Sequence, residues 1–242
     1  MKKLLCWLAG ISGFAALFIL FISGPLYRLE ILGLGNAFLL MRWAAYIGIA
    51  AIVLVLLALV ILRPSSNQHR AILGLSLILG FVSFYMPYNQ LQTARSVPAI
   101  HDISTDTVNP PEFVAVAPLR ADAPNPVEYA GPDVARQQLE AYPDIETMRF
   151  QQAPADVFAA ALAVVQGTGW EIVAAEANDG RIEATVTTTW FGFKDDVVIR
   201  IQGDGGETLL DMRSKSRLGG SDVGANAARI REFRESLMQR MR

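Results

Sequence analysis

Two groups of charged residues contain most of the side chains suited to binding or transforming a ligand. The first joins the acidic pair Asp195-Asp196 to the run Arg213-Ser214-Lys215-Ser216-Arg217, with Asp222 shortly after it. Guanidinium and ammonium groups bind carboxylates and phosphates, whereas grouped carboxylates suit hard divalent cations. The candidate polar site therefore comprises Asp195, Asp196, Arg213, Lys215, Arg217 and Asp222.

The spacing of this first group favours ion pairing between two strands. A turn at Gly203-Asp204-Gly205-Gly206, between strands at about 196–202 and 208–216, places the acidic pair opposite the basic run. A structural network of ion pairs explains both sets of charges. The alternative is a ligand site in which Arg213 and Arg217 hold a carboxylate or phosphate beside Gly219-Gly220-Ser221. A divalent cation at Asp195, Asp196 and Asp222 is less favoured, because basic residues adjoin them.

The second candidate group is His101 with Asp102 and Asp106. His101 is the one histidine in the second half of the chain, so a serine-type triad there would have to use it. No Gly-x-Ser-x-Gly elbow accompanies it, and an interface hydrogen-bonding role is favoured over catalysis. The second half also lacks cysteine and has no Walker or Gly-x-Gly-x-x-Gly spacing. We therefore expect no catalytic residue, no metal site and no cofactor.

These residues require a sheet and helices to position them. Helices are predicted at 133–141, from Pro154 to about Gly167, and at 223–241, where Ser221 or Asp222 can cap the start. Strands are predicted at 113–117, 170–174 and 182–190, besides the two named above. In the strand at 182–190 apolar residues alternate with polar ones, so one face should pack on the core and the other should be exposed to solvent. The fold class is α+β: an antiparallel sheet of about four to five strands with helices packed on one face.

The first part of the chain is predicted to be a membrane anchor over 1–90. Three apolar runs, at about 4–22, 43–62 and 71–88, approach the roughly 20 residues that cross a bilayer. The first is interpreted as an uncleaved span and not a signal peptide, because it is long and lacks a clear cleavage site. Cys6 precedes that run instead of following it, which argues against lipidation. An extended Pro-rich segment at 91–131 and a soluble domain at 132–242 should follow.

Charge predicts the orientation and limits the partners. Lys2 and Lys3 precede the first span, and Arg63 and Arg70 lie between the second and third, which indicates a cytoplasmic N-terminus. Three spans then place the second half in the periplasm or outside the cell. The predicted spans contain no ionisable Asp, Glu, Lys, Arg or His, which disfavours a transporter or channel. Residues 95–242 hold 15 basic and 22 acidic residues, so nucleic acid is not an expected partner.

Several segments of the second half resemble an uncharacterised bacterial family, the domain-of-unknown-function family 1499. The similarity lies in His101-Asp102-Ile103-Ser104-Thr105-Asp106, Asn109-Pro110-Pro111, Tyr142-Pro143, Gly169-Trp170, Arg181-Ile182-Glu183-Ala184, Phe193-Lys194-Asp195-Asp196 and Asp211 to Arg217. It continues through Gly219, Ser221-Asp222, Gly224, Asn226, Arg229-Ile230 and Phe233. The resemblance implies a soluble domain that often follows a membrane anchor, and it implies no established activity.

The leading functional hypothesis is a non-enzymatic scaffold or interaction domain in the bacterial envelope. It would be integral to the inner membrane, multi-pass, and available to envelope protein partners. The alternative is a small-molecule or lipid binding domain whose polar site surrounds Asp195, Asp196, Arg213 and Arg217. A hydrolase that uses His101 is the less favoured third hypothesis.

Overall fold

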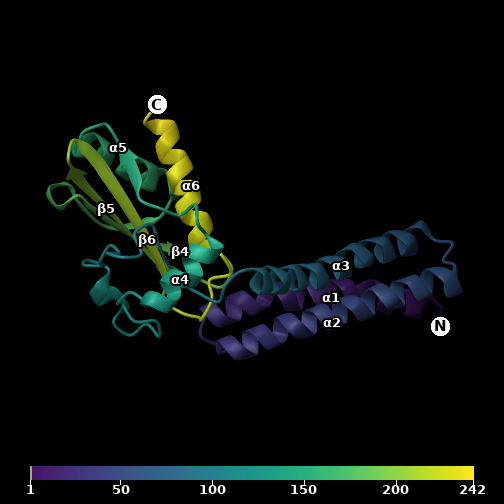
Figure 1. Ribbon diagram of the computed structural model, residues 1–242. Coiled ribbons are helices and arrows are strands. Elements are labelled where there is room, and N and C mark those ends of the chain that lie inside the picture. Colours follow the sequence, from purple (N-terminus) through teal and green to yellow (C-terminus); the bar gives the residue numbers. More distant parts are fainter. Residues whose placement is uncertain (1) are drawn as a thin grey trace. The chain divides into compact units, whose positions relative to one another are not determined.

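The computed structural model describes residues 2–242, which form two compact units (Figure 1). The first unit contains the described residues up to Gln92 together with Thr189–Gly192. The second contains Thr93–Thr188 and Phe193–Arg242. The fold is α+β, as predicted, with three apolar helices preceding a domain built on an antiparallel sheet.

The first unit is built mainly from three long helices. They are α1 (Lys2–Arg28), α2 (Leu34–Leu57), which continues as the π-helical turn η1 (Ala58–Leu62), and α3 (Asn67–Ser96). Each contains one of the predicted spans, and each is long and apolar enough to cross a membrane. These helices support association of the chain with a membrane.

Small residues allow the three helices to approach closely. Gly13 donates its backbone N–H to Ser76 Oγ at 3.0 Å, which joins α1 to α3. A Cβ added to Gly48 would lie only 2.6 Å from the carbonyl oxygen of Gly80, so α2 and α3 touch backbone to backbone. Cys6 is free and buried within the apolar cluster of this unit. Its position fits its expected role as a small apolar side chain.

The second unit contains six antiparallel strands. They are β1 (Asp102–Ser104), β2 (Met148–Phe150), β3 (Glu171–Glu176), β4 (Arg181–Thr187), β5 (Lys194–Asp204) and β6 (Glu207–Ser216). The sheet runs in the order β1-β6-β5-β4-β3, and β2 also pairs with β6. The short strands β1 and β2 were not predicted, because three residues give too brief a pattern to separate them from loops. The outer strand β3 carries an irregularity in its register between Ile172 and Ala174.

Helices cover one face of the sheet. The unit contains α4 (Pro132–Ala141), α5 (Pro154–Thr168) and α6 (Ala225–Arg240), with short 3-10 turns η2 (Ala117–Arg120) and η3 (Ala177–Asp179). Pro154 occupies the first turn of α5, and Gly169 ends the helix in the left-handed region at φ 74°. The core joins apolar residues of α5 and α6 to Ile182, Ile199 and Met212 of the sheet.

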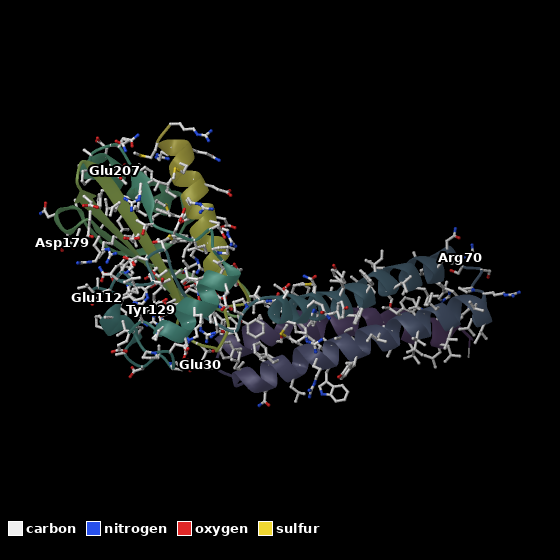
Figure 2. The ribbon with its side chains drawn as sticks, viewed as in Figure 1. Glu30, Arg70, Glu112, Tyr129, Asp179 and Glu207 are labelled. Atoms are coloured by element: carbon white, nitrogen blue, oxygen red, sulfur yellow. The ribbon has the colours of Figure 1, made fainter. Side chains whose placement is uncertain are left out.

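The opposite face of the sheet is covered as well, by residues 105–131, which we call the strap. Phe113 and Val116 of the strap pack on Val198 of β5 (Figure 2, where Glu112 and Tyr129 mark the strap). The prediction of a solvent-exposed face on β4 was therefore wrong: Glu183 is fully buried and Thr185 is 3% exposed. A sheet buried on both faces must pair any charge that it carries on either face.

The predicted strand at 113–117 is also absent. The chain there forms bends that lead into η2, and its backbone donors bond to a side chain and not to a neighbouring strand. Val114, Ala115 and Val116 donate their N–H groups to the Glu183 carboxylate at 2.9–3.1 Å. One buried carboxylate therefore takes the place of a ladder of hydrogen bonds.

Candidate functional site

The hairpin β5–β6 brings the acidic pair and the basic run together. Asp195 pairs in register with Ser216, and Asp196 with Lys215, so the predicted juxtaposition is confirmed. Because successive strand residues point to opposite faces, the acidic pair is divided between the two faces. Asp196, Arg213 and Lys215 lie under the strap, whereas Asp195 faces α6.

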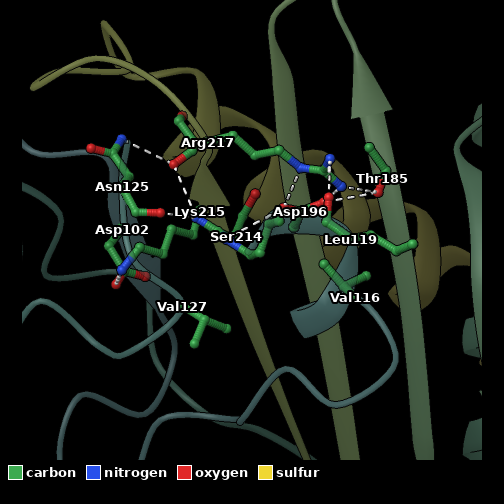
Figure 3. Close-up of polar contacts among 12 residues, drawn as sticks. Asp102, Val116, Leu119, Asn125, Val127, Thr185, Asp196, Ser214, Lys215 and Arg217 are labelled. Atoms are coloured by element: carbon green, nitrogen blue, oxygen red, sulfur yellow. Dashed lines mark hydrogen bonds and ion pairs between the residues drawn. The ribbon is translucent and has the colours of Figure 1, made fainter. Parts of the chain in front are cut away.

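Six residues form what we call the strap-face cluster: Asp102, Arg120, Asp196, Arg213, Lys215 and Arg217. Figure 3 labels Asp102, Asp196, Lys215 and Arg217 of this cluster. In its first half Asp102 binds two cations. Arg213 donates from Nε and Nη2 to the two Asp102 oxygens at 2.8 and 2.9 Å, and Lys215 Nζ lies 3.0 Å from Oδ2. Asp102 of the second candidate group therefore meets part of the first group, through β1 and β6.

The second half of the strap-face cluster is centred on Asp196. Arg217 donates to both of its carboxylate oxygens at 2.8 Å, and Thr185 donates its hydroxyl to Oδ1. Arg120 Nη1 lies 3.2 Å from Oδ2, an ion pair outside hydrogen-bond geometry. Bidentate contacts between guanidinium and carboxylate groups are the strongest ion pairs available to side chains.

The cations of the strap-face cluster also hold the strap itself. Arg213 donates to the carbonyl oxygens of Pro111 and Val127, and Lys215 donates to that of Glu128. The guanidinium of Arg213 lies 4.9 Å from the centre of the Phe113 ring, within cation–π range. The same side chains therefore pair the charges of the sheet and fasten the covering segment.

A separate polar group, the helix-face cluster, consists of Asp195, Ser214, Asn226 and Arg229. Arg229 Nη2 donates to Asp195 at 2.7 Å, and its Nη1 donates to Ser214 Oγ and to Asn226 Oδ1. Asn226 Nδ2 continues the network to the carbonyl oxygen of His101 at 3.0 Å. This cluster links the open end of the hairpin to the first turns of α6.

The remaining candidates have local structural contacts. Asp222 accepts from the N–H groups of Gly224 and Asn226 at 2.8 and 2.9 Å, at the start of α6. The cap position itself is occupied by Gly224 and not by Ser221 or Asp222 as predicted. Asp106 accepts from the N–H groups of Val108 and Asn109 and pairs with Arg200 at 3.1 Å. Neither carboxylate enters the strap-face cluster.

Burial changes the acid–base behaviour of several groups. Desolvation, reinforced by the positive charge of Lys215, lowers the pKa of His101, whose Nδ1 is buried without a hydrogen-bond partner. Desolvation also lowers the pKa of Lys215, against the opposing effect of Asp102. Burial beside Asp102 raises the pKa of Tyr129 to about 12. The neutral imidazole of His101 is therefore favoured more strongly than that of a solvent-exposed histidine.

Sequence reasoning missed several members of these networks. Arg120 and Glu183 come from segments with no pattern that links them to the hairpin, and Arg120 contacts Asp196 across 76 residues of chain. Glu183, Asn226 and Arg229 were recognisable only as part of the family resemblance. Within residues 2–242, no three His, Cys, Asp or Glu side chains form a group able to hold a metal ion.

Two comparisons with known proteins bear on this arrangement. The model of a family described as a protein of unknown function, DUF1499, matches residues 102–237. That range begins at Asp102 and contains every member of the strap-face and helix-face clusters. A search of the curated proteins finds no match.

Arg213→Ala should destabilise the second unit by about 3–5 kcal/mol, because it leaves the buried Asp102 carboxylate with one cation and frees two strap carbonyls. Urea-dependent proteolysis of the full chain in mild detergent measures this change. Arg231→Ala removes an arginine that pairs with Asp144 at the protein surface. It should lower the free energy of unfolding by about 1 kcal/mol or less. Equal losses in the two variants would contradict a structural role for the buried pair.

The second unit should lose stability as the pH falls below about 6.5, the ordinary value for histidine. Because the pKa of His101 is lowered in the folded protein, the unfolded chain takes up the proton first, and acid favours unfolding. His101→Gln should reduce this dependence of stability on pH. Thermal unfolding of both proteins between pH 7.5 and 5.5 provides the measurement, and parallel curves would show that His101 does not contribute.

Proposed function

We propose that this chain, which belongs to the DUF1499 family of proteins of unknown function, is a non-enzymatic interaction protein held in the bacterial inner membrane by its first unit. The second unit would stand on the periplasmic or extracellular side and bind envelope proteins. The distribution of exposed apolar side chains over the second unit carries this proposal.

Large apolar side chains emerge from the second unit almost entirely on the strap and α4. Of the five that are exposed in this unit, four are Val108, Val114, Leu119 and Leu139, and the fifth is Met238 near the end of α6. Val108, at 94% exposed, and Leu139 line an open groove of about 500 Å³ with Pro132 and Ala135. Clustered exposed apolar groups rimmed by polar ones typically mark a protein-binding surface.

The strap-face cluster explains how such a surface can be maintained. Charged side chains hold the strap from beneath at Pro111, Val127 and Glu128, and Glu183 holds three of its backbone N–H groups. Apolar residues on a pre-ordered segment bind without a large cost in chain entropy. The charged groups of the candidate polar site would thus support the binding surface from within.

The partner that fits this groove is an apolar segment of another envelope protein. Arg136 and Glu140 flank the groove with charges of opposite sign, which suits a segment with polar residues at its margins. The net charge of −7 over residues 95–242 argues against a nucleic acid or an anionic membrane surface as the partner.

Replacing Val108 and Leu139 together by Asp should abolish capture of the partner in crosslinking from intact membranes, because charges enter the apolar groove. Met238→Asp is the matched control, since it changes an exposed apolar residue outside the groove. Thermal stability of both variants should stay near that of the unchanged protein. If the double variant captures the partner as well as the unchanged protein does, the groove is not the binding surface. If the crosslinks join two copies of this chain, the partner is a second copy and not another envelope protein.

The orientation is tested by cysteine labelling in a Cys6→Ser background. Asp133→Cys on α4 should react with a membrane-impermeant maleimide in spheroplasts, because the second unit is proposed to be outside the cytoplasm. Ser65→Cys, between η1 and α3, should react only after the membrane is permeabilised. Labelling in the reverse order would place the second unit in the cytoplasm.

A further inference from the structure

The turn between β4 and β5 belongs to the first unit, although both strands belong to the second. Residues Thr189–Gly192, which we call the aromatic turn, group with the three long helices. The aromatic turn carries Trp190 and Phe191, whereas the turn between β5 and β6 consists of Gly205 and Gly206. Turns that face water typically carry glycine and small polar residues. Two large aromatic rings at this position therefore indicate an environment other than bulk water.

Hydrogen bonds seat the aromatic turn on the end of α1. Trp190 Nε1 donates to the carbonyl oxygen of Phe21 at 3.1 Å, and Arg28 Nη1 donates to that of Thr189 at 2.7 Å. Gly24 provides the space for this approach, because a Cβ added there would lie 2.3 Å from the Trp190 ring. Both ends of the last two turns of α1 are thus tied to the aromatic turn.

The second ring of the aromatic turn joins α1 to α2. Phe191 is 5% exposed, and its ring centre lies 5.9 Å from that of Tyr27 and 5.6 Å from that of Phe38. These separations are typical of packed aromatic pairs. The connection between α1 and α2 is therefore closed over by a side chain that the β4–β5 turn supplies.

The aromatic turn meets α1 at the height where the apolar runs of all three helices stop. The helices run side by side (Figure 1), and contacts of Gly13 with Ser76 and of Gly48 with Gly80 fix their relative heights. Counting along the helices from these contacts places positions 22, 43 and 88 within about one helical turn of each other. These are the ends of the predicted apolar runs on this side of the bundle.

Other aromatic side chains ring the bundle at the same height. Four of them are 46–54% exposed: Trp43, Tyr46, Tyr85 and Tyr88. Tryptophan and tyrosine gather where a membrane protein passes from hydrocarbon to the headgroups, because their rings are apolar with one polar edge. Arg28 and Arg95 follow within two helical turns, and such charges are costly in hydrocarbon.

We propose that the aromatic turn is a membrane-interface element, whose partner is the phospholipid headgroup region of the leaflet beside the α1–α2 connection. The chain thus meets the bilayer at two places, through its three helices and through the loop between β4 and β5. The net charge of −7 over residues 95–242 favours a zwitterionic surface over an anionic one. This inference rests on the membrane anchoring in the proposed function, and it is independent of the groove at Val108 and Leu139.

The test is fluorescence quenching of the full chain in phosphatidylcholine vesicles, by lipids that carry a nitroxide on the headgroup. Three variants each keep a single indole. The first keeps Trp190, and the second keeps Trp43 as the interfacial reference. In the third, Met238→Trp supplies the indole and all four native tryptophans are replaced by phenylalanine.

Met238 provides a control that is remote from the aromatic turn within the second unit. Gln152 donates to the carbonyl oxygen of Met241 at 3.5 Å and accepts from Thr208, near the turn that closes β5 and β6. The aromatic turn precedes the other end of β5, and strand residues rise about 3.3 Å each. The length of β5 therefore separates the two positions.

The fraction of emission quenched for Trp190 should lie within about twofold of that for Trp43, and should exceed that of the Met238→Trp protein at least about fivefold. If Trp43 is quenched and Trp190 is quenched no more than the remote control, this inference is overturned and the membrane anchoring stands. If Trp43 is not quenched either, both are overturned.

A pair of glycine variants tests the seat on α1. Gly24→Ala brings a Cβ to 2.3 Å from the Trp190 ring, so the aromatic turn must move. Hydrogen exchange of the amides at 189–193 should then accelerate about tenfold or more. Gly74→Ala is the matched control, because its Cβ meets nothing within 4 Å, and it should leave this exchange unchanged. Equal exchange in the two variants would show that α1 does not hold the turn, which overturns the second attachment.

Discussion

The second unit depends on the pairing of charges buried between its sheet and its strap. One face of the sheet carries Asp102, Asp196, Glu183, Arg213 and Lys215. These charges are well solvated in water, and covering them costs desolvation free energy unless each is paired. The strap covers this face and at the same time supplies the carbonyl oxygens and backbone N–H groups that these charges require. Neither the sheet face nor the strap is satisfied without the other, so the two must form together.

This mutual requirement gives the sheet two unlike faces. The face toward α5 and α6 is an apolar core closed at one end by the helix-face cluster, whereas the face toward the strap is largely ionic with a small apolar patch at Phe113, Val116 and Val198. Apolar packing tolerates small rearrangements, but hydrogen-bonded ion pairs have strict geometry. The position of the strap is consequently set by the geometry of its hydrogen bonds, and not only by how well its side chains fill space.

The sequence was sufficient for the elements whose patterns are local. Alternation along β4, the glycine-rich turn before β6 and the proline that opens α5 are each contained within a few residues. The placement of the acidic pair opposite the basic run followed from counting back from that turn. The strap could not be predicted in this way, because its N–H groups bond to Glu183, which lies 67 to 69 residues away. For the same reason Arg120 went unrecognised, and a buried ionic face was taken for a solvated one.

The outer edge of the sheet has a consequence for the protein at high local concentration. Strand β3 ends in Glu171 and Glu176, and its register is interrupted between Ile172 and Ala174, while the far side of the sheet ends in two strands of only three residues. Charged ends, a bulge and short strands all hinder the addition of a strand from a neighbouring molecule. Many copies confined to one membrane can therefore crowd together without their sheets joining into fibrils.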